Sequence, residues 1–198
     1  KTSFHASTIA APDGFASRGA KCMVLCNEES YERVGARYLC AATSMSMDEV
    51  KTNMAVAALR YDPVEKNVFI KDSTGKDMAW VEAIVKAYEP DIVVLDMGDK
   101  FATHKGYARP DEALKACAVH ARQIAKQYDC AVLYMSQLSA EAEGKVLLNQ
   151  SMMEGSRTGK AAEADLMLLI AKNPVVEGQE EEDTQRHLNI VKNKLTGW

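Results

Sequence analysis

The chain has 198 residues, 47% of them hydrophobic and 26% charged, a composition typical of one globular α/β domain with a buried core. Its formal net charge of −4 excludes a protein that binds nucleic acid through an overall basic surface, so we expect any DNA contact to be local. The five cysteines lie mostly inside apolar runs and lack the spacing of a zinc site, which indicates buried free thiols and a reducing, cytoplasmic location. No apolar run approaches the ~20 residues needed to span a bilayer, so we expect no membrane partner.

Strand-like runs of Val, Ile, Leu and aromatic residues alternate with longer segments of helical spacing. This alternation predicts an α/β fold with a mostly parallel central sheet flanked by helices. The predicted strands are Lys21–Cys26, Asn67–Lys71, Asp91–Asp96, Ala131–Ser136, Leu166–Ala171 and Leu188–Lys192. The predicted helices are Thr2–Ile9, Ser30–Ala42, Met47–Leu59, Met78–Tyr88 and Asp111–Tyr128, and the irregular segments are Asp99–Pro110, Ser139–Ala161 and Asn173–Arg186.

The first three residues, Lys1, Thr2 and Ser3, lead into a predicted helix that is followed by a turn and a strand. In a phosphate-binding loop of the form GxxxxGK[ST], backbone amides cradle phosphates, the lysine reaches the β and γ oxygens, and the hydroxyl holds Mg²⁺. We interpret these residues as the end of such a loop. The interpretation depends on the strand ends that come later in the chain.

Three predicted strands end in residues that suit phosphate chemistry. Asp96 ends an apolar strand, where a carboxylate can hold Mg²⁺ through water, although it could equally be a helix-capping residue. Glu28 and Glu29 follow another strand, where a glutamate can orient and deprotonate an attacking water. The alternative for Glu29 is an acid that the helix dipole favours. Gln137 follows a third strand and could sense a γ-phosphate, or simply begin a loop.

Taken in order, these features resemble the C-terminal motor of DnaB-type replicative helicases and of phage primase–helicases. The resemblance extends over nearly the whole chain and implies a single RecA-like ATPase domain, residues 1–198, that begins within its own phosphate-binding loop. The stretches that carry it are Asn27–Ser30, Phe69–Gly75, Asp91–Asp96, Ala125–Leu138, Glu163–Met167 and Ile190–Gly197.

The resemblance implies ATP, or another NTP, and Mg²⁺ as cofactors. By position, Lys1 and Ser3 bind phosphate, whereas Thr2 and Asp96 act on the metal. Glu28 becomes the catalytic base, because the family's base follows directly after the strand, and Gln137 becomes the γ-phosphate sensor.

In this family a neighbouring subunit completes each ATP site with a basic finger, and the matching residues here are Lys192 and Lys194. The family usually has arginine where this chain has Lys194, which is a point charge without the planar fork of a guanidinium. Three alternatives follow: one of the two lysines acts as the basic finger, Arg157 or Arg186 takes its place, or the motor hydrolyses ATP slowly.

The resemblance places DNA contacts in the loops that follow Asp96 and Gln137. Several cations per subunit add up around a ring to a basic channel without making the subunit basic. Solvated side chains on mobile loops are the alternative for any one of them. The candidate DNA-binding residues are Lys100, Lys105, Arg109, Lys145, Arg157 and Lys160.

We therefore expect an ATP-dependent replicative helicase motor that hydrolyses NTP at the subunit interfaces of a hexameric ring, translocates on single-stranded DNA and unwinds duplex. Primase or polymerase are candidate partners, and some features are typical of a phage protein that works in the cytoplasm of a bacterial host. Two alternatives stay open. One is a RecA/KaiC-type ATPase without unwinding activity, and the other is a degenerate RecA-like module retained for assembly.

Overall fold

The computed structural model describes residues 1–102, 106–155, 159–174 and 185–196. Lys105 and Arg157, two of the candidate DNA-binding residues, lie outside these ranges. The chain divides into two compact units, which are described separately. Unit 1 comprises Lys1–Thr103 and Gln123–Met135, and unit 2 comprises His104–Arg122 and Ser136–Trp198.

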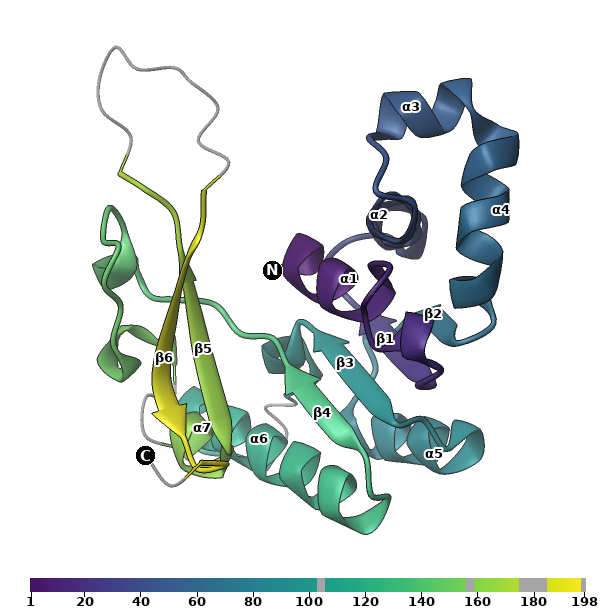
Figure 1. The fold of residues 1–198 in the computed structure, drawn as a ribbon. Helices are drawn as coiled ribbons and strands as arrows, with labels where there is room; N and C mark the ends of the chain where they lie inside the picture. Colours follow the sequence, from purple (N-terminus) through teal and green to yellow (C-terminus); the bar gives the residue numbers. More distant parts are fainter. Residues whose placement is uncertain (103–105, 156–158, 175–184, 197–198) are drawn as a thin grey trace. The chain divides into compact units, whose positions relative to one another are not determined.

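Four parallel strands form the sheet of unit 1, in the order β2-β1-β3-β4 (Figure 1). They are β1 (Cys22–Cys26), β2 (Val68–Asp72), β3 (Ile92–Asp96) and β4 (Ala131–Tyr134). Every residue of β1 and β3 is buried, because both strands are central and parallel sheets are covered by helices on both faces. The predicted α/β fold with a parallel central sheet is confirmed.

Helices cover both faces of this sheet. On one face, Val24 of β1 and Val94 of β3 share an apolar core with Ile9 and Val34 of the first two helices. Figure 1 shows α5 on the other side of the sheet, as right-handed crossovers between parallel strands require. The first six helices in chain order are α1 (Thr2–Ala10), α2 (Tyr31–Thr43), α3 (Met47–Thr52), α4 (Met54–Glu65), α5 (Met78–Tyr88) and α6 (Pro110–Gln127). Within the described ranges, no helix combines the length and apolar content needed to cross a membrane.

The helix predicted over Met47–Leu59 is in fact two helices that meet at Asn53. The φ of −126° and ψ of 47° of Asn53 lie outside the helical region, so the hydrogen-bond ladder is interrupted there. α3 starts with a capping box, in which the Ser46 hydroxyl accepts from the Glu49 amide and the Glu49 carboxylate accepts from the Ser46 amide. α4 continues beyond the predicted end, to Glu65. The helical spacing of the sequence therefore did not reveal the break between α3 and α4.

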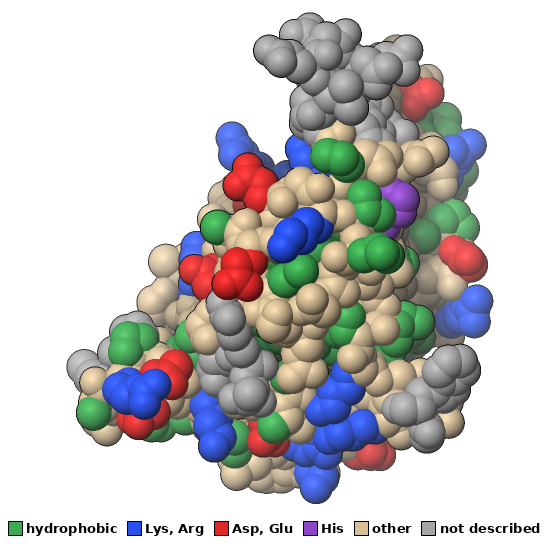
Figure 2. All heavy atoms as spheres, turned by 90° about the vertical axis from the view of Figure 1, so that its left-hand side faces the viewer, with side chains coloured by type: hydrophobic (Ala, Val, Ile, Leu, Met, Phe, Trp, Pro, Cys, Tyr) green, Lys and Arg blue, Asp and Glu red, His purple; other side chains and the backbone are tan. Residues whose placement is uncertain are grey.

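The two strands of unit 2 form an antiparallel ribbon. β5 (Leu166–Ala171) pairs with β6 (His187–Asn193), and a bulge lies between Met167 and Leu168. Met167 belongs to a second apolar core, whereas Leu188 and Ile190 are exposed. Figure 2 faces this ribbon and shows hydrophobic side chains at the surface. The sequence predicts both strands, and the structure adds their antiparallel pairing. The described residues of this unit also form short helices, namely α7 (Gly159–Glu163) and the 3-10 helices Ala140–Ala142 and Gln150–Met152, so the segment Ser139–Ala161 is not wholly irregular as predicted.

All five cysteines are free, and Cys22, Cys26, Cys117 and Cys130 are buried, as predicted, whereas Cys40 is partly exposed. Burial raises the pKa of Cys22 to about 12 and the pKa of Cys26 to about 11. Both thiols face the core between β1 and the helices α1 and α2, where a thiolate would have no water. They therefore act as small apolar side chains at neutral pH.

This burial predicts a loss of stability at alkaline pH. Above the ordinary thiol pKa of 9.0 the unfolded chain releases protons that the folded chain keeps. The free energy of unfolding should therefore fall between about pH 9 and pH 11, by up to about 1.4 kcal/mol per pH unit for each thiol. Urea unfolding over this range measures the slope. Cys22→Ala is the matched control, and an equal slope in both proteins would contradict the assignment.

Candidate functional site

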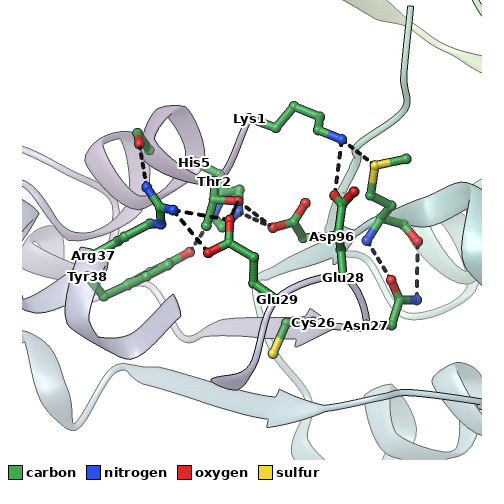
Figure 3. Close-up of polar contacts among 12 residues, drawn as sticks. Lys1, Thr2, His5, Cys26, Asn27, Glu28, Glu29, Arg37, Tyr38 and Asp96 are labelled. Atoms are coloured by element: carbon green, nitrogen blue, oxygen red, sulfur yellow. Dashed lines mark hydrogen bonds and ion pairs between the residues drawn. The ribbon is translucent and has the colours of Figure 1, made fainter. Parts of the chain in front are cut away.

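The carboxyl ends of β1 and β3 lie side by side in unit 1. The strands are in register with Cys26 opposite Asp96, and the Asn27 amide donates to the Asp96 carbonyl over 2.9 Å. Helix α1 begins at the same edge of the sheet, so residues from the start of the chain meet residues from two strand ends (Figure 3). The C-terminal edge of a parallel sheet is the usual position of ligand sites in α/β folds.

Lys1 and Glu28, the predicted phosphate-binding lysine and catalytic base, form an ion pair. Lys1 Nζ lies 3.1 Å from Glu28 Oε2, and the two side chains are each 30% exposed. Lys1 Nζ also contacts the sulfur of Met97. Because the pair is reachable by solvent, its attraction is modest, and an anion of higher charge can compete with Glu28 for the lysine.

Asp96 receives two hydrogen bonds on the same carboxylate oxygen. Thr2 Oγ1 donates to Asp96 Oδ2 over 3.0 Å, and His5 Nε2 lies 3.1 Å from that atom. Asp96 is only 1% exposed, and its Oδ1 has no hydrogen-bond partner among the residues that the structure describes. Burial opposes ionisation, but the hydrogen bonds from His5 and Thr2 and the charge of Lys1 lower the pKa of Asp96 below its ordinary value. Asp96 is therefore a buried carboxylate with one free acceptor.

These properties fit a divalent cation. An unpartnered, buried, ionised oxygen is destabilising unless a positive charge or a donor reaches it. Mg²⁺ is bound in proteins through one or two carboxylates, waters and substrate phosphates, and the hydroxyl of Thr2 stands beside the carboxylate. The predicted metal-linked pair, Thr2 and Asp96, is thus brought together.

Glu29 contacts Arg37 rather than Lys1. Arg37, on α2, holds Glu29 with two hydrogen bonds of 3.0 and 3.2 Å and reaches Ser3 Oγ over 3.4 Å. Glu29 Oε1 is also 3.4 Å from Thr2 Oγ1. The two neighbouring acids therefore have different partners, and Ser3, predicted to bind phosphate, lies against this arginine.

Asn27 joins the ends of β1 and β3. Its side-chain amide donates to the Met97 carbonyl over 3.2 Å and accepts from the Met97 amide over 2.8 Å. Both backbone groups of Met97 are thereby satisfied where the ladder between the strands ends. The amide of Asn27 fixes the chain between Asp96 and the loop that follows.

Two further polar residues, His5 and Tyr38, are connected to Asp96 by hydrogen bonds. His5 and Tyr38 are fully buried, and His5 Nδ1 lies 2.9 Å from the Tyr38 hydroxyl. Burial raises the pKa of Tyr38 well above its ordinary value, so the hydroxyl keeps its proton at neutral pH. Sequence reasoning missed His5, Tyr38, Asn27 and Arg37, because each of them resembles an ordinary core or surface residue until its distant partner is known.

With this geometry established, comparison with known proteins places the chain. Residues 4–143 match the family described as "AAA domain". The chain belongs to this family. Comparison with curated protein sequences finds no match.

Solved structures define the fold of this AAA domain more closely. It is similar to a solved structure described as an ATPase domain, with a TM-score of 0.80 and 16% sequence identity over 98% of this chain and 73% of that one. It is also similar to a DnaB-like replicative helicase solved for its interactions with primase, with a TM-score of 0.71 and 14% identity over 90% of this chain. The alignment covers 46% of that helicase chain. The fold is the RecA-like ATPase fold of DnaB-type helicases, as the sequence predicted.

Lys192 and Lys194, which are predicted to complete the ATP site of a neighbouring copy, lie in unit 2. Lys192 Nζ donates to the carbonyls of Ala161 and Ala162, and Lys194 Nζ donates to Ala162 over 3.3 Å. Burial, and then the nearby Lys194, lower the pKa of Lys192. Both lysines thus interact with the C-terminal carbonyls of α7. Gln137 also belongs to unit 2, and its predicted sensor role, like that of the lysines, stays a prediction.

The candidate DNA-binding residues that the structure describes differ in their surroundings. Lys100 and Lys145 are exposed. Arg109 is exposed and forms an ion pair of 2.9 Å with Asp111. Lys160 is only 4% exposed, and its Nζ donates to Ser136 Oγ over 2.8 Å, so it is not a solvated loop lysine. Contact with DNA stays a prediction for all four.

The double hydrogen bond of Asn27 predicts a measurable loss on truncation. Asn27→Ala leaves the amide of Met97 without its acceptor and removes one of the two donors to the Met97 carbonyl, which keeps the Lys100 amide. The free energy of unfolding should therefore fall by about 2 kcal/mol. Urea denaturation measures it. Asn53→Ala, which removes a single exposed hydrogen bond, is the control and should change stability by no more than about 0.5 kcal/mol. Equal losses in the two variants would show that the bridge to Met97 contributes nothing special.

Proposed function

We propose that this chain is the ATP-hydrolysing motor of a replicative DNA helicase. The observation that carries the proposal is the arrangement at Asp96, where Thr2 occupies one carboxylate oxygen and the other is buried and unpartnered among the described residues. Lys1 and Glu28 lie at the same edge of the sheet. The AAA family and the RecA-like fold support the same activity.

In this proposal each residue of unit 1 has one task. Lys1 binds the β and γ phosphates of ATP, and Thr2 and Asp96 hold Mg²⁺, which neutralises charge on the phosphates when it is bound. Phosphate oxygens attract Lys1 away from Glu28. The freed carboxylate then orients the attacking water and accepts its proton. At the same time the bond between the γ-phosphorus and the bridging oxygen of ADP breaks. Glu28 is thus held by the lysine when no nucleotide is present.

The remaining parts of the proposal concern unit 2 and the assembly. Gln137 would sense the γ-phosphate, and Lys192 or Lys194 would complete the ATP site of an adjacent copy in a hexameric ring. The ring would move along single-stranded DNA and exclude the other strand. The DnaB-like helicase to which the chain is similar was solved for its interactions with primase, which supports a primase as partner.

The assignment of the base predicts the effect of exchanging one acid for an amide. In the full-length protein, Glu28→Gln should lower the rate of ATP hydrolysis by about 10²–10⁴-fold, because the amide cannot accept the proton of the attacking water. ATP binding should persist, since the amide has nearly the same shape. Steady-state ATPase assays and nucleotide-binding titrations measure the two effects.

Glu29→Gln is the matched comparison, because Glu29 is bound to Arg37 and should be less important for the rate. A variant series in which Glu29→Gln abolishes hydrolysis and Glu28→Gln does not would reassign the base. Absence of DNA-stimulated hydrolysis in the unmodified protein would refute the motor. Strand-displacement assays separate a helicase from a RecA/KaiC-type ATPase that does not unwind DNA.

The predicted DNA-binding loops imply a particular salt dependence. Lys100→Ala or Lys145→Ala should weaken binding to single-stranded DNA of any sequence and reduce the slope of log K against log salt by about 0.7 for each phosphate that the protein no longer neutralises. Lys66→Ala is the control, because Lys66 is an exposed cation at the end of α4, outside the predicted DNA loops. Binding titrations at several salt concentrations measure the slopes, and three identical slopes would rule out a role for these lysines.

A further inference from the structure

Three buried polar side chains form a row of hydrogen bonds that ends at the candidate metal site. Tyr38 is 0% exposed, His5 is 0% exposed and Asp96 is 1% exposed. The hydroxyl of Tyr38 lies 2.9 Å from His5 Nδ1, and His5 Nε2 lies 3.1 Å from Asp96 Oδ2. Figure 3 shows these side chains converging from α1, α2 and β3. Neither His5 nor Tyr38 has a part in the proposed hydrolysis.

The chemistry of these groups gives the row a direction. An ionised carboxylate only accepts hydrogen bonds, so the proton between His5 and Asp96 must be on Nε2. In a neutral imidazole Nδ1 is then the acceptor, and the Tyr38 hydroxyl donates to it. When the imidazole is neutral, the Tyr38 hydroxyl therefore favours the tautomer of His5 that donates to Asp96.

The same row determines which oxygen of Asp96 stays available. A carboxylate otherwise rotates over a broad range, because its terminal torsion has no sharp minimum. Here both donors, from His5 and Thr2, meet Oδ2, and Oδ1 meets none among the described residues. The tyrosine and histidine thus do for the carboxylate what outer-shell partners do for metal ligands, which is to fix their orientation.

We propose that His5 and Tyr38 are positioning residues that hold the Asp96 carboxylate with Oδ1 directed to a divalent cation. The proposal rests on the metal-linked role of Asp96 in the proposed function. A purely structural histidine would fill space and satisfy its own nitrogens, and the loss of the tyrosine hydroxyl would then affect stability alone. A positioning role predicts a change in metal affinity as well.

Tyr38→Phe tests this inference in the full-length protein, because it removes the hydroxyl and keeps the ring. Without that donor His5 can place its proton on Nδ1 and turn a lone pair toward Asp96 Oδ2, which repels the carboxylate. Mn²⁺ binding in the presence of ADP, followed by electron paramagnetic resonance, should weaken about tenfold, as is usual for loss of an outer-shell partner. Binding of ADP without metal should not change.

Tyr61→Phe is the control, since Tyr61 is a partly buried phenol that packs against the same apolar core without touching His5 or Asp96 in the described contacts. Its Mn²⁺ affinity should equal that of the unmodified protein. Equal Mn²⁺ affinities in Tyr38→Phe and Tyr61→Phe would overturn the positioning role. If Asp96→Asn also binds Mn²⁺–ADP normally, the proposed metal site itself is wrong, so the two failures are distinguishable.

A spectroscopic measurement on the unmodified protein tests the inference even if Tyr38→Phe does not fold. Solid-state NMR of protein labelled with ¹⁵N-histidine distinguishes the tautomers, and a His5→Gln spectrum identifies the His5 signals. A proton on Nε2 is expected. A neutral ring with its proton on Nδ1 would overturn the inference, because His5 could not then donate to Asp96, and a ring protonated on both nitrogens would overturn the role of Tyr38 as its donor.

Discussion

The parallel pairing of β1 with β3 is the constraint on which the rest of the site depends. The register sets Cys26 opposite Asp96, so the residues that follow β1 and the acid that ends β3 emerge at one edge. Both strands are buried along their whole length, so a slip of one residue would move each side chain to the opposite face of the sheet and disrupt the packing on both faces. The position of Glu28 relative to Asp96 is therefore maintained by packing far from the polar groups themselves.

The site also contains polar side chains that are buried away from water, and each of these side chains forms a hydrogen bond that offsets the cost of its burial. Thr2, His5 and Asp96 are buried, and hydrogen bonds connect them over 3.0 and 3.1 Å. Isolated burial of any of them would be unfavourable by several kcal/mol. The exception is Asp96 Oδ1, and an exception of this kind in an otherwise satisfied network indicates where a ligand atom belongs.

The sequence predicted the strands, most helices and the acids at strand ends, because those features are local. An apolar run followed by an acid is visible within a few residues, as at Asp91–Asp96. The partners of those acids are not local. Asp96 meets His5, and Asn27 meets Met97, across separations that no short pattern records. The division at Asn53 escaped prediction for a different reason, since one residue outside the helical region leaves the helical spacing of its neighbours intact.

Arg37 and Tyr38 are consecutive residues of α2, yet they reach the site by separate routes. Arg37 binds Glu29 and Ser3, and Tyr38 binds His5 and, through it, Asp96. Two consecutive residues of α2 are thus connected by hydrogen bonds to the loop after β1 and, through His5, to Asp96 at the end of β3. A movement of α2 would therefore disturb the hydrogen bonds to Glu29 and, through His5, those to Asp96 at the same time.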